Sequence, residues 1–427
     1  MGSKFLLKTM GCKANQFEGG IIIENLVSNG FEEVKTVAEA DFFILNSCTV
    51  THKSDNEALY LLRNAKHENS RITNVITGCV AQVRKDELLE LDYVDLVIGN
   101  DEKLSLSDYL TMQTKCAVAD LMVKEDFNPV VLNDISKTRI GLKIQDGCNS
   151  RCAYCIIPFA RGKSRSASVE FLTEQINKYA EHGYKEVVLT GIHIGQWGKE
   201  CGGKLLDLLR DIEKTKIARY RLGSLNPSEI DEELLDFLQK SDKFCPHFHL
   251  SLQSACDKTL RAMNRFYKTE DYLAQIEDIK RRWKNPFLGS DIIVGFPGET
   301  DEEFEETYNN LKRSGLTQIH TFPYSIRKGT QAAGMEGHLT DAVKAKRADK
   351  IKELSRQKYN EFIDKNIGKV VSILIEKRLD KRLGCYKGVT KNYLTVLINS
   401  ETPNLFNTLQ NVKIIQNKDG KLFAEIV

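Results

Sequence analysis

Residues 144–166 read IQDGCNSRCAYCIIPFARGKSRS and place Cys148, Cys152 and Cys155 within eight residues. Structural zinc sites normally use four protein ligands, and a cubane iron–sulfur cluster is usually held by four cysteines. A set of three therefore leaves one metal position open to bind a reacting molecule. The residues alone also allow a zinc knuckle with a distant fourth ligand, such as Cys116 or a histidine.

This close cysteine triplet follows the first strand of a repeated strand–helix pattern. Amphipathic helical stretches separate six apolar, strand-like runs at 139–145, 186–191, 219–225, 247–253, 290–296 and 318–325. Six such units predict an open (β/α)6 barrel, smaller than the eight-fold version. Barrel chemistry is carried at the C-terminal strand ends, which is where the triplet lies.

A second strand–helix alternation precedes the barrel. Strand-like runs occur at 4–10, 42–46, 74–77 and 94–99, and they predict an α/β domain with a doubly wound parallel sheet. Because parallel strands end at one shared edge, three thiols that follow three of these strands are expected to converge there: Cys12, Cys48 and Cys79. The alternative is that they are three buried structural cysteines.

The chain is expected to divide into three domains, at residues 1–125, 134–365 and 366–427. The last one carries strand-like runs at 369–377, 393–398, 412–416 and 421–427, which predict a small antiparallel β-barrel. It holds ten Lys/Arg against five Asp/Glu, whereas the whole chain has a net charge of only +2. This local surplus indicates contact with a polyanion.

The composition excludes several classes of protein. The chain has 427 residues, of which 41% are hydrophobic, enough for a sizeable core. Its start has no apolar signal segment and no run of 18 apolar residues occurs, so we expect no membrane partner. Eleven cysteines without an export signal predict a cytoplasmic protein, in which clustered cysteines serve as metal ligands or catalytic groups.

The triplet spacing in GCNSRCAYCIIPFARG resembles the signature of the radical S-adenosylmethionine (SAM) enzymes. The resemblance implies that Cys148, Cys152 and Cys155 are catalytic, because they hold a [4Fe–4S] cluster whose open iron binds SAM and whose electron generates a 5′-deoxyadenosyl radical. Tyr154 resembles the aromatic residue that lies near the adenine. The positions expected to contact SAM, or else only to mark turns, are Gly191, Ser224 and Gln253 at strand ends, Arg265 in MNRFY (263–267), and Val294 and Gly295 in DIIVGFPGE (291–299).

With Cys12, Cys48 and Cys79 and the C-terminal strands, the sequence resembles the methylthiotransferases over essentially its whole length. The resemblance implies a second [4Fe–4S] cluster on these N-terminal cysteines, carrying an exchangeable sulfur, and a C-terminal TRAM-like RNA-binding domain. It also implies two uses of SAM, one to methylate a sulfur species and one to form the radical. The stretches most similar to the branch acting on N6-threonylcarbamoyladenosine 37 of tRNA are TGCVAQ (77–82), LTGIHIGQWG (189–198) and HTFPYSIRKGTQAAGM (320–335).

The expected partner is the anticodon loop of tRNA. Phosphate contacts are predicted at Arg161, Lys163 and Arg165 beside the triplet, and at Lys381, Arg382 and Lys387 in the C-terminal domain. The family usually has a further arginine where this chain has Ala167. The resemblance also implies a reducing partner, of flavodoxin or ferredoxin type, and a sulfur donor.

Other functions remain open at this stage. The chain could act on isopentenyladenosine 37 or on a ribosomal protein, it could be a different radical SAM enzyme such as a methyltransferase, or it could be a non-catalytic iron–sulfur protein that binds RNA. Histidines near strand ends, among them His193, are expected to be half-buried structural residues rather than metal ligands.

Overall fold

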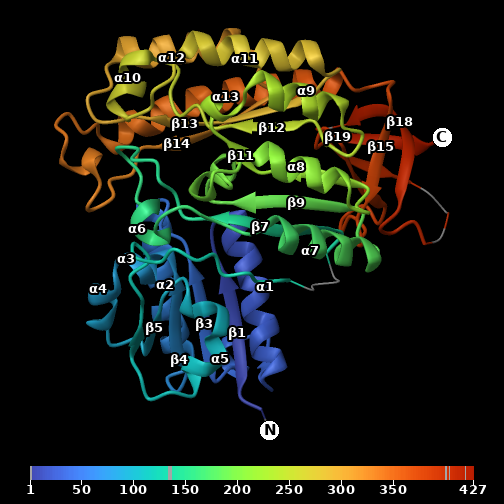
Figure 1. Ribbon diagram of the computed structural model, residues 1–427. Helices are drawn as coiled ribbons and strands as arrows, with labels where there is room; N and C mark the ends of the chain where they lie inside the picture. Colours follow the sequence, from blue (N-terminus) through green and yellow to red (C-terminus); the bar gives the residue numbers. More distant parts are fainter. Residues whose placement is uncertain (1, 133–136, 400–401, 403, 419) are drawn as a thin grey trace.

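Figure 1 shows the computed structural model, which describes residues 2–132, 137–399, 402, 404–418 and 420–427. A parallel sheet in blue lies below a larger barrel coloured green to orange, and a small red barrel lies at its side. The division into three domains stays a prediction, and its boundary at residue 134 falls outside the described residues. In the described part, no helix has the length and apolar character needed to cross a membrane.

The N-terminal sheet is parallel throughout, with strand order β2-β1-β3-β4-β5-β6. Alternate residues of β3 face opposite sides: Ile44 packs in one apolar cluster with α1, and Phe43 in another with α2. Helices therefore cover both faces, as a doubly wound sheet requires. The elements are β1 (Lys4–Thr9), α1 (Lys13–Ser28), β2 (Glu32–Glu33), β3 (Phe42–Ser47), α2 (His52–Glu68), β4 (Thr73–Gly78), α3 (Cys79–Val83), β5 (Leu96–Ile98) and β6 (Cys116–Ala117).

The central barrel confirms the predicted open (β/α)6 architecture. Its third strand is interrupted at Gly223, so that β10 pairs in parallel with β9 while β11 pairs in parallel with β12 of a second sheet. In the part of the chain that the structure describes, the first strand β7 and the last strand β14 do not pair with each other. The barrel is therefore open between them. The strands are β7 (Arg139–Asp146), β9 (Glu186–Gly191), β10 (Arg219–Leu222), β11 (Ser224–Leu225), β12 (His247–Leu250), β13 (Phe287–Val294) and β14 (Gln318–Pro323).

Amphipathic helices surround the barrel and bury their apolar faces against its strands. The long α13 (Asp341–Asp364) packs along β14, where Ala348 and Ile351 join the barrel core. The other helices of this layer are α7 (Val169–Glu181), α8 (Leu205–Glu213), α9 (Glu232–Lys240), α10 (Asp257–Ala262), α11 (Thr269–Arg282) and α12 (Asp301–Arg313).

The C-terminal strands close into the predicted small β-barrel, in the order β15-β16-β17-β19-β18. Four of its strand pairs are antiparallel, as expected from the sequence. The fifth pair, β17 with β19, is parallel, so the expected antiparallel direction does not hold for that pair. The strand β19 is antiparallel to β18 and runs alongside β17 in the same direction. The strands are β15 (Val370–Ile375), β16 (Tyr386–Thr390), β17 (Thr395–Ile398), β18 (Leu409–Lys418) and β19 (Lys421–Ile426).

Candidate functional site

The three N-terminal cysteines lie at one edge of the first sheet. Cys12 precedes α1, Cys48 follows β3 and Cys79 begins α3, directly after β4. The strands that lead to them, β1, β3 and β4, are neighbours in the sheet. The C-terminal ends of adjacent parallel strands therefore bring three distant cysteines together, as expected from the sequence.

Two glycines allow the N-terminal loops to approach one another. Gly11 and Gly78 both have a left-handed backbone, with φ of 86° and 89°. A Cβ at position 11 would stand 2.5 Å from the sulfur of Cys48, and one at 78 would stand 2.4 Å from the Ser47 carbonyl oxygen. Only glycine fits both conditions, because it has no Cβ and adopts positive φ freely.

The N-terminal thiols are close enough to influence one another electrostatically. Burial, followed by the charges of Cys79 and Cys12, raises the pKa of Cys48 to about 11. A metal ion would reverse this preference, because a coordinating thiol is deprotonated. The set therefore suits a metal centre better than a reactive free thiolate.

The close triplet lies in the loop between β7 and α6 (Ile157–Arg161). The loop is fixed by backbone hydrogen bonds: the Cys148 N–H donates to the Gly162 carbonyl at 3.0 Å, and the Ala153 N–H donates to the Met263 carbonyl at 3.0 Å. The pKa of Cys155 is raised to about 12, and burial is the largest cause of this shift.

Two cationic side chains face the triplet. Nη1 of Arg265 lies 3.5 Å from the sulfur of Cys152, and Nδ1 of His193 lies 3.3 Å from the sulfur of Cys148. Burial acts to raise the pKa of Cys148, but the hydrogen bond and charge of His193, together with hydrogen bonds from Ser150, outweigh it and lower the pKa. His193 pairs through Nε2 with Glu229, so its ring is a satisfied histidine that is also a fixed neighbour of the triplet.

A cleft of about 1810 Å³ lies next to the segments that carry Cys48, Cys79 and Cys155, although none of the six cysteines lines it. It is lined by residues that follow Cys48, Cys79 and Cys155 in the chain, including Thr51, Gln82 and Phe159, and by the loop after β14, including Tyr324 and Arg327. The Asn100 amide donates to the Ala160 carbonyl at 2.8 Å, which links the first sheet to the triplet loop. In Figure 1, α3 and α6 lie side by side, and contacts between these two helices confirm it.

The residues expected to contact SAM lie around the barrel mouth, but several have local roles. Arg265 is 7% exposed and already donates to Asn226, to the Ser251 carbonyl and to Tyr267. A Cβ on Gly191 would stand 2.7 Å from the Gln145 carbonyl oxygen, so packing alone requires glycine there. The hydroxyl of Ser224 contacts His249 at 2.9 Å.

The other residues expected to contact SAM also have local structural roles. Gln253 has a left-handed backbone, with φ of 73°, and its N–H donates to the Asp291 carbonyl at 2.8 Å. Val294 is buried at the end of β13, and the Gly295 N–H donates to a carboxylate oxygen of Glu299 at 2.9 Å. Burial holds the pKa of the half-buried Tyr154 well above its usual value. The roles of these residues in binding SAM stay predictions.

Two of the predicted phosphate contacts are inside the protein. Arg161 is 1% exposed and forms a bidentate ion pair with Glu18, and Arg165 is 4% exposed. Their prediction as surface contacts was wrong, because ion pairing to distant carboxylates overrides the polarity of the loop. Lys163 is exposed, as are Lys381 and Arg382, whereas Lys387 pairs with Glu376 at 3.0 Å; contact of these four with RNA stays a prediction.

The chemistry of the two donor sets fits iron–sulfur clusters. Each set offers three thiols, and the close triplet also has Arg265 and His193 beside it. Among the described residues, no His, Cys, Asp or Glu side chains are grouped tightly enough to hold a single metal ion. A cubane is a larger body than one ion, and its ligands stand further apart.

The fold and the triplet together define a radical SAM enzyme. Residues 142–311 match the Radical SAM superfamily, and residues 4–99 match the family described as Uncharacterized protein family UPF0004. A solved structure of the radical SAM methyltransferase TsrM from Kitasatospora setae has a TM-score of 0.55 with 14% identity, covering 78% of this chain and 77% of that one. That likeness supports the fold alone.

Two similar proteins specify the family. The Aquifex aeolicus protein named threonylcarbamoyladenosine tRNA methylthiotransferase MtaB is 37% identical over 92% of this chain and 96% of its own length. The Thermodesulfovibrio yellowstonii protein named tRNA-2-methylthio-N(6)-dimethylallyladenosine synthase is 32% identical over 100% of this chain and 99% of its own length. The chain belongs to the radical SAM methylthiotransferase family.

Proposed function

We propose that the protein is a tRNA methylthiotransferase that converts N6-threonylcarbamoyladenosine 37 into its 2-methylthio derivative, with SAM and two [4Fe–4S] clusters. The observation that carries the proposal is the presence of two three-cysteine sets on parts of the chain that contact each other through α3 and α6. One set lies in the radical SAM barrel and the other at the edge of the N-terminal sheet. A single radical cluster would leave the second set without a role.

The identity of the modified nucleoside is supported by relatives with that name. Four of them, at 34–37% identity, cover most of the chain. Relatives named for dimethylallyladenosine reach 32–34% identity, so the margin between the branches is small. The dimethylallyl branch is therefore the second candidate.

The chain's own residues would hold, orient and shield the reacting groups. Cys148, Cys152 and Cys155 would hold the SAM cluster, with Arg265 and His193 fixing two of these thiols. Cys12, Cys48 and Cys79 would hold the second cluster. When bound, the cofactors supply the radical and the sulfur, while the protein supplies distance, exclusion of water and substrate position.

The remaining parts of the proposal concern partners. The exposed cations of the C-terminal barrel would bind tRNA phosphates, and the cleft would receive the base at position 37. An external reductant and a sulfur donor complete the reaction, and the cytoplasm is the proposed compartment.

Nucleoside mass spectrometry of tRNA from a deletion strain tests the function. Loss of 2-methylthio-threonylcarbamoyladenosine, restored by the intact gene, is the expected result. Loss of the isopentenyl analogue alone would move the protein to the other branch. Unchanged tRNA with an altered ribosomal protein would reject a tRNA substrate, and no change in either would support a non-catalytic role.

A further inference from the structure

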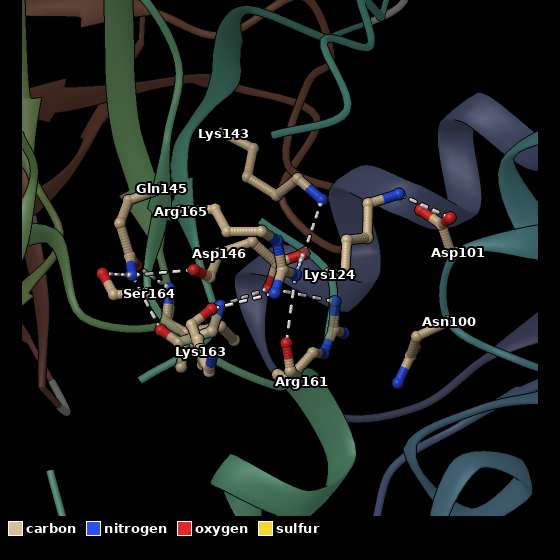
Figure 2. A network of polar contacts seen from close by, with 12 residues as sticks. Asn100, Asp101, Lys124, Lys143, Gln145, Asp146, Arg161, Lys163, Ser164 and Arg165 are labelled. Carbon is tan, nitrogen blue, oxygen red and sulfur yellow. Dashed lines mark hydrogen bonds and ion pairs between the residues drawn. The ribbon is translucent and has the colours of Figure 1, made fainter. Parts of the chain in front are cut away.

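A buried group of charges joins the N-terminal sheet to the barrel. Glu18 on α1 accepts hydrogen bonds from Arg161 at 2.5 and 2.9 Å and from Lys143 at 2.9 Å, and Lys103 lies 2.6 Å from its other oxygen. Figure 2 shows Arg161, Lys143, Asp146 and Arg165 gathered at this junction. None of the four side chains bonded in this way is more than 2% exposed.

The charges in this group do not balance. Its cations are Lys103, Lys143, Arg161 and Arg165, whereas its only described carboxylates are Glu18 and Asp146. With all four cations protonated, two positive charges have no matching carboxylate in this largely buried region, and burial lowers the pKa of Lys103. Leaving buried charge unpaired is costly, so a further anion is expected nearby.

The nearest source of that anion is the N-terminal cysteine set. Lys103 donates to the side-chain oxygen of Asn100 at 2.8 Å, and the Asn100 amide lies 3.8 Å from the sulfur of Cys79. Burial acts to lower the pKa of Arg161, but the charges of Glu18 and then Cys79 hold it well above its usual value. The Nε donor of Arg161 is buried and has no hydrogen-bond partner.

We propose that Lys103 and Arg161 are positioning residues that supply the positive counter-charge of an anionic cluster on Cys12, Cys48 and Cys79, with Glu18 holding both cations in place. The inference rests on the second cluster of the proposed function. The potential of an iron–sulfur cluster depends on local charge and on hydrogen bonds to its sulfurs. Two excess cations favour the reduced, more negative form, so they raise the reduction potential.

The test uses the full chain with Cys148, Cys152 and Cys155 replaced by Ala, so that only the N-terminal cluster can form. Redox titration followed by electron paramagnetic resonance measures its midpoint potential. K103M and R161Q each remove a cation and shift the potential to more negative values. E18Q removes an anion and shifts it to more positive values. Iron loss to a chelator becomes about tenfold faster in K103M and R161Q.

Matched variants separate charge from folding. R161K keeps the positive charge and is expected to leave the midpoint potential unchanged. K124M removes a half-exposed cation that pairs with Asp101 outside the group, and it is also expected to leave the potential unchanged. If E18Q does not fold, D146N is used in its place. It also removes a negative charge and is expected to shift the midpoint potential to more positive values. Shifts in the same direction for cation and anion variants, or equal potentials in all of them, overturn the inference. Failure of the parent to bind four irons rejects the second cluster itself.

Discussion

The imidazole of His193 bridges Cys148 and Glu229, with Nδ1 lying 3.3 Å from the cysteine sulfur and Nε2 paired with the carboxylate. Glu229 fixes the orientation of the ring, as outer carboxylates commonly do for metal-site histidines. The three residues come from the triplet loop, the segment after β9 and the segment after β11. The orientation of Cys148 thus depends on three strand ends of the barrel.

Replacing His193 with Ala removes this contact and is expected to weaken retention of the radical SAM cluster about 10- to 100-fold, the usual effect of losing an outer-shell partner. Iron release to a chelator measures it, in a variant whose N-terminal cysteines are replaced by Ala. His182→Ala is the control, because His182 is exposed and contacts the Lys178 carbonyl at the end of α7. Equal release from both variants would contradict the role of His193.

Anaerobic reconstitution is expected to load about eight irons per chain, four on each cysteine set. Each set offers three thiols, and a cubane held by three cysteines keeps one iron open. Iron and acid-labile sulfide analysis measures the loading. A value near four, or stoichiometric zinc, would rule out the two-cluster arrangement.

The C-terminal barrel is expected to bind tRNA through the loop between β15 and β16, where Lys381 and Arg382 are exposed. Replacing both with Ala should weaken binding and reduce the slope of log affinity against log salt by about two, since each phosphate contact contributes about 0.9. Filter binding over a range of salt concentrations measures it. The control is K214A/K216A, which removes two exposed cations on the barrel exterior. Equal slopes for the two double variants would place the tRNA contact elsewhere.

Glu186 stabilises the junction of the two barrels. It is fully buried and pairs with Arg219 at 2.7 Å and with Arg221 at 3.2 Å. Both arginines donate to carbonyls of the C-terminal barrel, at Val389 and Lys391. Glu186→Gln leaves buried cations unpaired and should lower the free energy of unfolding by about 3 kcal/mol at neutral pH.

The same carboxylate gives stability a defined pH dependence. Burial acts to raise its pKa, but Arg221 and Arg219 outweigh this and hold the pKa below the ordinary value of 4.5. Its contribution is therefore complete above pH 4.5 and is lost as the pH falls towards the lower, folded-state pKa. Urea unfolding across this window should show a smaller loss in the Gln variant. Parallel losses in both proteins would assign the acid sensitivity to other groups.

The sequence predicted what depends on local pattern. Strand–helix alternation gave both parallel architectures, and Cys12, Cys48 and Cys79 were placed correctly because each follows a strand. Pairing across long distances was not predictable in this way. Arg161 looks like a surface residue in its loop, yet its partner Glu18 is 143 residues away. His193 carries no local signal either, because Cys148 lies 45 residues before it.

The C-terminal barrel illustrates a second limit. The strand β16 was not predicted, since its sequence YKGVT contains a glycine and few apolar residues. Gly388 packs closely there: a Cβ would stand 2.6 Å from the terminal methyl carbon of Ile373 on the neighbouring strand, and that carbon would have to shift. A residue that weakens the local strand pattern is thus favoured by the contact between strands.

The two cysteine sets are expected to separate in function. Replacing Cys148, Cys152 or Cys155 with Ala should abolish reductive SAM cleavage, because that cluster supplies the electron. Replacing Cys12, Cys48 and Cys79 together should leave 5′-deoxyadenosine formation intact but stop methylthio transfer, since these residues lie on a different sheet from the triplet. SAM cleavage and nucleoside analysis are measured side by side on variants shown to be folded. A purely structural role of the N-terminal cysteines would instead lower both activities together, and full methylthiolation by the N-terminal triple variant would remove the second cluster from the mechanism.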